Sequence, residues 1–371
     1  MIGKQRSVLG FFATGLPLVA TIIIFLMIGI IVAEFAIIGV PNLSWEFITS
    51  FPRNMNTEGG IFPAIYGTLL LVIIMTIIAV PIGTITAIYL TEYARQSSIF
   101  ARTIRFAVNT LAGVPSIVFG LFGVGFFIQT VGASIDESRW NDKLATMQQA
   151  LVEPRAPFAT SKSAPLKAVT TFLTNDDEAY WREAVRGLEG YKGGENATVT
   201  VDSVVKHLIT KPELKWGKPA MIWAAFTLAL LTLPVVIVSV DEALRTVPRD
   251  VREASLALGA TKLETIRKVV VPNSITGILT GSILAVSRGA GEVAPILLTG
   301  AVYSLQELPT QLTDQFMHLG YHLYILATQS TDVEAARPLQ YATTVVLLML
   351  TAGLNLTAIM LRSRIRKRQF S

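Results

Sequence analysis

The sequence predicts an all-α polytopic membrane protein with six transmembrane helices. Of the 371 residues, 51% are hydrophobic and 15% are charged, whereas an ordinary soluble domain has about 25% charged residues. Six apolar runs recur along the chain, each close to or above the ~20 residues that a helix needs to cross a bilayer. The basic residues are concentrated in alternate connections between these runs. All three observations disfavour a soluble protein.

The apolar runs define the expected spans. They are Phe11–Ala33, Gly59–Thr91, Phe106–Ile135, Pro219–Val240, Ser274–Ser287 with its continuation past Glu292, and Pro338–Leu361. The first run follows Lys4 and Arg6, as the core of a signal peptide would, but it exceeds the usual signal core of about 7–15 residues. We therefore expect it to remain as an uncleaved helix. In the fifth run, Gly277 and Gly281 have the spacing of a small-residue contact between helices.

Positive charge predicts the orientation. Segments 1–11, 92–105, 241–274 and 362–371 would lie on one side of the membrane and hold 16 Lys and Arg residues, whereas loops 41–63 and 301–340 hold two. The positive-inside rule places the first side, and hence both termini, in the cytoplasm. The basic end Arg362–Arg368 directly follows a span, so we interpret it as a topological anchor at membrane lipid and not as a nucleic-acid site.

Residues 136–217 differ in composition from the rest. They carry 12 acidic and 11 basic side chains, and we expect a periplasmic insertion of about 80 residues that packs as a small subdomain. Its sequence suggests helices at Asp136–Ala150, Asp176–Leu188 and Val201–Ile209, with a loop at Gly190–Asn196. The chain would thus divide into spans one to three (1–135), the insertion (136–217), and spans four to six (218–371).

The segment Asp241–Pro272, which we call the coupling loop, is mixed in charge and helical in pattern. Apolar residues recur at spacings of three and four, which predicts one amphipathic helix; they are Leu244, Val247, Val251, Ala254 and Leu258. Gly259 would interrupt this helix, and a second helix, Thr261–Val271, would end at Pro272. Two short helices joined at a glycine form a knob suited to a groove in a soluble partner.

The coupling loop resembles the EAA loop of binding-protein-dependent ABC importers, whose pattern is E-A-A-x3-G-x9-I-x-L-P. Glu253, Ala254, Gly259 and Pro272 match this pattern, whereas Ser255 replaces the second alanine and Val269 and Val271 replace the isoleucine and leucine. This resemblance implies a type I (MetI-like) permease architecture and a loop, including Arg252, that docks on an ATP-binding subunit. The chain contains no G-x-x-x-x-G-K-[ST] motif, so we expect ATP hydrolysis to belong to that partner.

Arg288 and Glu292 are two charged residues within the apolar stretch of the fifth span. At positions i and i+4 of a helix they would share one face, and their cost in a membrane predicts that they face a bundle interior or a wet cavity. Two interpretations remain open. The residues form an ion pair that fixes helix packing, or Arg288 offers its fork of donors to a passing oxyanion while Glu292 holds it in place.

Two stretches are similar to phosphate ABC permeases of the PstA type. Ser287–Pro295 is similar to A-R-A-x-G-E-T-A-P around Arg288 and Glu292 but departs from it at Ser287, Gly289 and Val293, and Ala112–Gly123 matches A-G-V-P-S-I-V-x-G-L-F-G. The resemblance implies a subunit of an ATP-driven phosphate importer in the bacterial inner membrane. It also implies a paralogous PstC-type permease, PstB-type ATP-binding subunits and a periplasmic phosphate-binding protein as partners.

Other functions receive less support from the sequence. His318 and His322 stand four residues apart, but no third metal ligand is evident, so we expect an ordinary pair at the outer interface and no metal or cofactor. No set of nucleophile and base indicates an enzyme. The open alternatives are a permease for another oxyanion, such as sulfate or molybdate, and a membrane-anchored sensor or interaction module built on residues 136–217.

Overall fold

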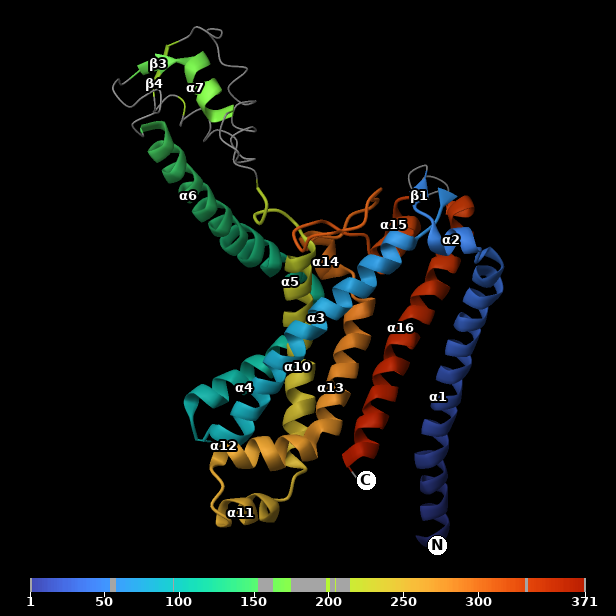
Figure 1. Cartoon of the computed structure of the whole chain (residues 1–371). Coiled ribbons are helices and arrows are strands. Elements are labelled where there is room, and N and C mark those ends of the chain that lie inside the picture. Colours follow the sequence, from blue (N-terminus) through green and yellow to red (C-terminus); the bar gives the residue numbers. More distant parts are fainter. Residues whose placement is uncertain are drawn as a thin grey trace. The chain divides into compact units, whose positions relative to one another are not determined.

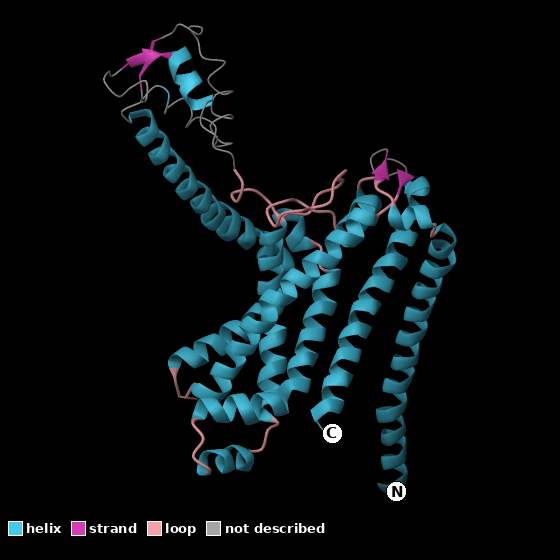
Figure 2. Cartoon of the chain, viewed as in Figure 1, coloured by secondary structure: helices cyan, strands magenta, loops and turns pink. Residues whose placement is uncertain are grey.

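The computed structural model describes residues 2–53, 58–95, 97–152, 163–174, 198–200, 204, 214–330 and 333–369. The chain divides into two compact units. Unit 1 comprises Met1–Gly123 and Pro219–Ser371, and unit 2 comprises Val124–Lys218. The helices of unit 1 form the bundle seen in Figures 1 and 2.

Six helical segments in the described part of the chain are long and apolar enough to cross a membrane. They are Gly15–Asn42, Phe62–Tyr93, Ser116–Asp142, Met221–Arg245, Lys262–Gly291 and Ala336–Ile365. The number of spans predicted from the apolar runs is therefore confirmed, and the protein is a multi-pass membrane protein.

Unit 1 begins with a long helix and a short connection to the second span. The elements are α1 (Ile2–Gly39), the 3-10 turn η1 (Val40–Asn42), α2 (Trp45–Thr49), the strands β1 (Pro52–Arg53) and β2 (Glu58–Gly59), α3 (Phe62–Ile88), the π-helical segment η3 (Tyr89–Tyr93), α4 (Ile99–Leu111) and α5 (Ser116–Phe122). Strands β1 and β2 pair in an antiparallel hairpin. The π-helical segment η4 (Gly123–Gly132) contains the boundary between the two units.

The second half of unit 1 carries the coupling loop and the last two spans. Its elements are α10 (Met221–Arg245), α11 (Arg249–Ala257), α12 (Lys262–Thr265), the π-helical segment η5 (Ile266–Val270), α13 (Val271–Gly291), α14 (Ala294–Thr299), α15 (Leu319–Thr328) and α16 (Val333–Gln369). In Figure 1, the start of α1 and the end of α16 lie at the same end of the bundle as α11 and α12, opposite α2 and α15.

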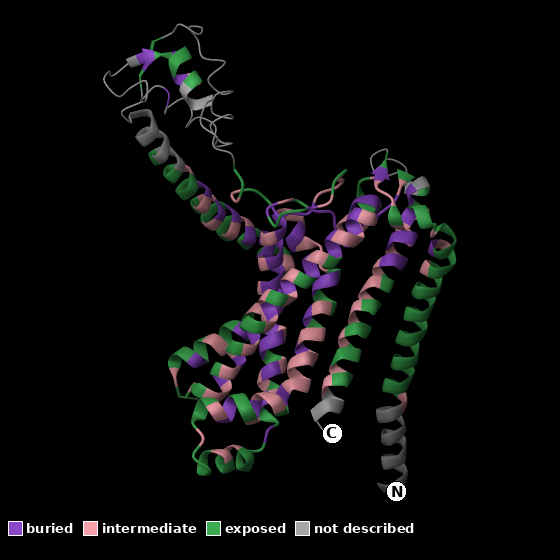
Figure 3. Ribbon diagram, viewed as in Figure 1, coloured by how far each residue is buried: buried purple, intermediate pink, exposed green. Residues whose placement is uncertain are grey.

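The core of unit 1 lies where α3, α10 and α13 pack together. Its buried side chains include Leu71, Met75 and Leu228. Gly277 and Gly281 of α13 lie against Ala243 and Ser239 of α10, where an added Cβ would contact their side chains. The predicted small-residue contact is thus confirmed. In Figure 3, the described part of α1 is exposed over most of its length, as expected of a lipid-facing helix.

The third predicted span, Phe106–Ile135, was wrong at its beginning. Phe106 belongs to α4, which ends at Leu111, and a new helix, α5, begins at Ser116 after Pro115. Proline lacks a backbone N–H and disfavours helical geometry in the residue before it, here Val114. Pro81, by contrast, lies inside the continuous helix α3.

Unit 2 contains α6 (Ala133–Val152), β3 (Ser163–Pro165), α7 (Leu166–Thr174) and β4 (Thr198–Thr200), with β3 and β4 antiparallel. The helix predicted at Asp136–Ala150 is confirmed within α6. The expected helices Asp176–Leu188 and Val201–Ile209 and the loop Gly190–Asn196 lie outside the described residues, apart from residue 204.

One carboxylate closes the base of unit 2. Asp136 accepts hydrogen bonds from the backbone N–H groups of Trp216, at 2.8 and 3.0 Å, and Gly217, at 2.7 Å. Gly132, one turn earlier, lies against the Trp216 carbonyl and has no space for a side chain. The first and last described segments of the unit therefore meet at Asp136.

Candidate functional site

The coupling loop starts differently from the prediction. The single helix expected from Leu244 to Leu258 was wrong, because α10 ends at Arg245 and α11 begins at Arg249, after Pro248. Pro248 disfavours helical geometry at Val247, the residue before it. Leu244 and Val247 are buried in unit 1, so they fix the root of the loop and do not form part of a docking surface.

Gly259 ends α11 in the conformation that its position predicts. Its φ of +86° lies in the left-handed region, which costs a residue with a Cβ roughly 1–2 kcal/mol. The Gly259 N–H donates to Leu256 O at 3.0 Å, and the Ala260 N–H donates to Ser255 O at 3.3 Å. These two bonds form a Schellman motif, which satisfies carbonyls at the end of the helix.

Two side-chain contacts fold the second half of the loop onto the first. Thr261 and Glu264 form a reciprocal capping box at the start of α12. The hydroxyl groups of Ser255 and Thr265 lie 3.0 Å apart and share a hydrogen bond. Ser255, which departs from the family alanine, thus joins α11 to α12.

Pro272 does not end the second helix, so that prediction was wrong. The helical path continues through η5 into α13, with Pro272 in the first turn of α13. The wider turns of η5 accommodate a proline that cannot donate to the preceding turn. The side chains of Asn273 and Ser274 donate to the carbonyls of Val269 and Val270, at 2.7 and 2.9 Å. In Figure 1, this segment forms the corner between α12 and α13.

Several apolar side chains of the loop, between Val251 and Leu263, are left uncovered by this chain. Leu258 is 90% exposed and Leu263 is 65% exposed. Val251 and Leu256 of α11 are also exposed, as are Glu253 and Ala254 of the EAA motif. Exposed large apolar side chains that cluster in this way are typical of a surface that binds another protein.

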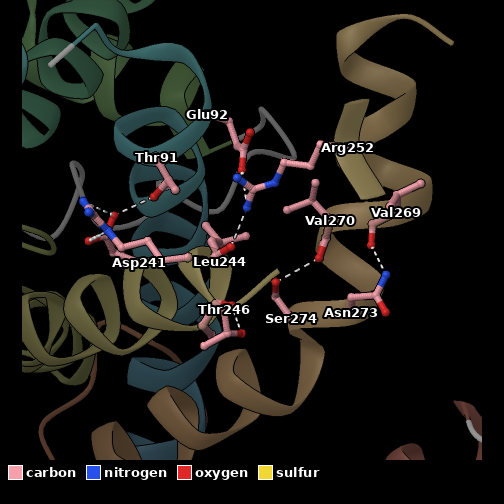
Figure 4. A network of polar contacts seen from close by, with 12 residues as sticks. Thr91, Glu92, Asp241, Leu244, Thr246, Arg252, Val269, Val270, Asn273 and Ser274 are labelled. Carbon is pink, nitrogen blue, oxygen red and sulfur yellow. Dashed lines mark hydrogen bonds and ion pairs between the residues drawn. The ribbon is translucent and has the colours of Figure 1, made fainter. Parts of the chain in front are cut away.

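Arg252 ties α11 back to the bundle. Its Nη2 donates to Leu244 O at 2.6 Å and lies 3.2 Å from Glu92 Oε1. Glu92 belongs to η3, so the ion pair joins the coupling loop to the last turn of the second span. Figure 4 shows the Arg252 side chain between Glu92 and Leu244.

A second polar cluster lies beside the first and centres on Asp241 of α10. The Asp241 carboxylate accepts a hydrogen bond of 2.6 Å from Thr91 and one of 2.9 Å from Arg245 Nε. Arg105 of α4 lies 3.6 Å from the same carboxylate and donates to Leu90 O at 2.6 Å. The Asp241 cluster therefore links α10, α4 and η3 (Figure 4).

Arg288 and Glu292 form an ion pair, but not on one helix face. Arg288 Nε lies 3.4 Å from Glu292 Oε1. Helix α13 ends at Gly291, and Glu292 is extended, with φ −81° and ψ 129°. The expectation of a helix continuing past Glu292 was wrong. Arg288 lies in the last turn, where the partial negative charge of the helix end favours a cation, and its side chain is 38% exposed in this chain.

The structure brings the two PstA-like stretches together. A Cβ on Gly120 would lie 3.0 Å from Pro295 Cα, so α5 and α14 are in close contact. Next to Arg288, Gly289 lies directly against the buried side chain of Met75 on α3. On the other side of Arg288, Asn355 of α16 donates to the Ser287 hydroxyl at 3.1 Å. The position of Arg288 is therefore fixed by contacts of its two neighbours.

His318 and His322 are buried inside the protein. The sequence predicted an ordinary pair at the outer interface and gave no indication of this burial. His318 is fully buried and caps α15, accepting a hydrogen bond from the Gly320 N–H at Nδ1. Burial lowers the pKa of His318 to about 3 and that of His322 to about 4. Within the described ranges, no group of three His, Asp or Glu side chains is placed to hold a metal ion.

The sequence did not single out Glu92, Asp241 or Met75. Glu92 and Asp241 are acidic residues at the ends of apolar runs, on the side rich in basic residues. An acidic residue at such a position was the sequence signal that could have identified them. Met75 is one apolar residue among many in its span, and only the contact with Gly289 distinguishes it.

Comparisons with known proteins identify the family of the chain. The family described as "Binding-protein-dependent transport system inner membrane component" matches residues 79–369. The phosphate transport system permease protein PstA 1 of Mycobacterium tuberculosis (strain CDC 1551 / Oshkosh) is 29% identical, over 82% of this chain and 71% of that protein. The probable ABC transporter permease protein YqgI of Bacillus subtilis (strain 168) is 25% identical, over 80% of this chain and 72% of that protein.

Among solved structures, the inward-facing MetNI methionine ABC transporter is similar over 81% of this chain and 94% of that chain, with 15% identity and a TM-score of 0.45. The family match covers more than half of the chain and includes the coupling loop, Arg288 and Glu292. The chain therefore belongs to the family of inner membrane components of binding-protein-dependent transport systems.

Proposed function

We propose that this chain is a permease subunit of an ATP-driven importer of inorganic phosphate in the bacterial inner membrane. The observation that carries the proposal is the uncovered apolar surface of the coupling loop, at the end of the bundle where both termini lie. A surface of this kind, in a chain without a phosphate-binding loop for nucleotide, supports a soluble partner that supplies ATP hydrolysis. Phosphate as cargo is supported by relatives that are named phosphate transport system permeases.

The proposed complex contains four kinds of chain. Beside this subunit it has a paralogous PstC-type permease, two PstB-type ATP-binding subunits on the cytoplasmic side, and a periplasmic phosphate-binding protein. The basic inner segments support cytoplasmic termini, and the part of unit 2 that follows the third span then lies in the periplasm. The chain itself carries out no covalent chemistry.

Arg288 is the residue that we propose meets the anion. Its guanidinium offers a planar fork of donors, suited to two oxygens of a phosphate. It is partly exposed and paired with Glu292 at 3.4 Å, so an anion could replace the carboxylate without breaking a buried network. When the ATP-binding subunits close, movement of the coupling loop would tilt α13 and turn Arg288 toward alternate sides of the membrane.

The test measures uptake of radiolabelled phosphate by cells that express the complex. We expect Arg288→Ala to lower uptake by about tenfold or more, because a charge-assisted bond contributes about 1.5–3 kcal/mol, and Arg288→Lys to be intermediate. Arg53→Gln is the matched control, since Arg53 also forms an ion pair, with Glu46, but both side chains are about two-thirds exposed. A normal rate of phosphate uptake in the Arg288→Ala variant would show that Arg288 has a structural role only.

The same assay separates phosphate from other oxyanions. An excess of unlabelled sulfate or molybdate should leave phosphate uptake unchanged if phosphate is the cargo. Competition by either anion would indicate a permease for that anion. Mass identification of the chains that co-purify with this subunit from native membranes checks the proposed composition.

A further inference from the structure

We propose that the ion pair between Arg252 and Glu92 is a second mechanical connection between the coupling loop and the fifth span, and that Arg252 is a positioning residue for transport. The first connection is the covalent path from α12 through η5 into α13. The second would run through η3 and α3 and meet α13 beside Arg288. This inference rests on the proposed function, because it presumes that an ATP-binding partner moves the loop.

The first step is the anchoring of η3. Three successive residues of this π-helical segment are held by three different helices. Arg105 of α4 donates to Leu90 O, Asp241 of α10 accepts from Thr91, and Arg252 of α11 pairs with Glu92. Of these three helices, α11 alone belongs to the exposed knob, so the contact with Glu92 joins η3 directly to that knob (Figure 4).

The second step is the continuity of η3 with α3. Ile88 and Tyr89 both have right-handed helical geometry, and the Tyr89 N–H bonds back to the preceding turn. A helix that continues without a break moves as a rigid element. A shift of Glu92 along or across its axis is therefore passed to the whole second span.

The third step is the contact between α3 and α13. Met75 is fully buried, and a Cβ on Gly289 would lie 2.7 Å from its Cε. Met75 is 17 residues from Glu92, and Arg288 is 17 residues from Val271. Both distances correspond to about 26 Å of helix. The two paths from the coupling loop therefore converge at one level of α13.

The environment of the ion pair distinguishes it from a surface contact. The side chain of Glu92 is 10% exposed and that of Arg252 is 21% exposed. Removal of one partner would leave the other charge largely buried, which is costly. The pair thus holds α11 against η3.

The main experiment uses the complete transporter in proteoliposomes with its binding protein and measures phosphate imported per ATP hydrolysed. We expect Glu92→Gln and Arg252→Gln each to lower this ratio by about fivefold, within the range known for mutations that alter coupling between sites. The double variant should be no worse than either single variant, and the charge exchange Glu92→Arg with Arg252→Glu should recover at least half of the ratio. A wild-type ratio in Glu92→Gln, or additive losses in the double variant, would overturn the inference.

The far end of the path is tested at Met75, away from the loop. Met75→Ala should lower the ratio, because it removes the contact with Gly289, whereas Met75→Leu conserves the volume and should keep it. A wild-type ratio in a folded Met75→Ala complex would refute the path through α3.

A last measurement does not depend on the cargo. The sequence contains no cysteine, and a side chain added at Gly291 meets no atom within 4 Å, so Gly291→Cys places the single thiol of this chain beside Glu292, and labelling is read on this chain. In the complex, a nucleotide analogue should change the rate of labelling by a water-soluble maleimide, and Glu92→Gln should abolish that change. A change that persists in Glu92→Gln contradicts the inference. Failure of phosphate import with an intact labelling response contradicts only the proposed function.

Discussion

Gly259 has a backbone conformation that a side chain would strain, although there is space for one. Its φ is +86°, and nothing lies within 4 Å of an added Cβ. Gly259→Ala should therefore destabilise the end of α11 by about 1–2 kcal/mol through the backbone alone and weaken binding of the ATP-binding subunit, as measured by co-purification. Gly353→Ala is the matched control, because that site is equally open and its φ lies outside the left-handed region. Equal losses in both variants would contradict the role of the left-handed turn.

The buried imidazoles predict a dependence of stability on pH. His318 and His322 have pKa values of about 3 and about 4 in the folded protein, against about 6.5 when unfolded. Below pH 6.5, protons then bind preferentially to the unfolded chain. The contribution of the two histidines to the free energy of unfolding is therefore fully present above pH 6.5 and decreases as pH falls toward 4. Each histidine contributes at most about 1.4 kcal/mol per pH unit in this window.

Thermal unfolding of the purified complex between pH 7.5 and 4.5 checks this sign. The decrease in Tm toward low pH should be smaller for His322→Gln, which keeps a polar side chain but cannot gain a proton. An unchanged pH profile in that variant would show that other groups cause the decrease. His318→Gln is less suitable, because it also removes the cap of α15.

At the scale of elements, the sequence predicts the spans well and their ends poorly. Apolar runs decide which segments cross the membrane, because that choice depends on composition over about 20 residues. The ends depend on single residues in context. Pro115 and Pro248 start new helices, whereas Pro81 and Pro272 are accommodated within continuing ones. Proline thus interrupts the helical path at some positions and lies within a continuing helix at others, and the local sequence alone does not distinguish the two cases.

The candidate site was predictable to a similar degree. The EAA motif identified the loop, and the left-handed turn at Gly259 follows from the residue itself. The partner of Arg252 could not be predicted, because Glu92 is 160 residues away in sequence and the packing of α11 against η3 decides the contact. The pairing of Arg288 with Glu292 was predicted, but through a helix that in fact ends between them, at Gly291.

For the whole molecule, the division into two units predicts that the part of unit 2 beyond the third span is separable. The hydrophobic clusters that stabilise the bundle consist of unit 1 residues, and the base of unit 2 is closed by Asp136 with Trp216 and Gly217. Replacement of residues 143–213 by a short Gly/Ser linker should therefore leave folding and phosphate uptake intact. Asp136→Ala in the full chain should instead loosen unit 2, as measured by limited proteolysis.

The excision experiment also decides between permease and sensor. Retained uptake would make unit 2 an accessory to transport. Loss of uptake in a variant that still assembles would contradict the separability of the two units. Loss of a regulatory output with uptake intact would favour the interpretation of residues 136–217 as a sensor carried by a permease.

The π-helical segment η5 is a place where the fifth span can lose one residue without rotating. A π-type turn accommodates one residue more than an α-helical turn, so deletion of one residue between Ile266 and Val270 should restore regular winding and leave the azimuth of α13 unchanged. A deletion before Gly277, inside α13, would instead turn the rest of that helix by about 100°. Gly277, Gly281 and Arg288 would then each point to the wrong neighbour, without any change in their identity. The corner thus tolerates a change of length that the helix one turn later does not.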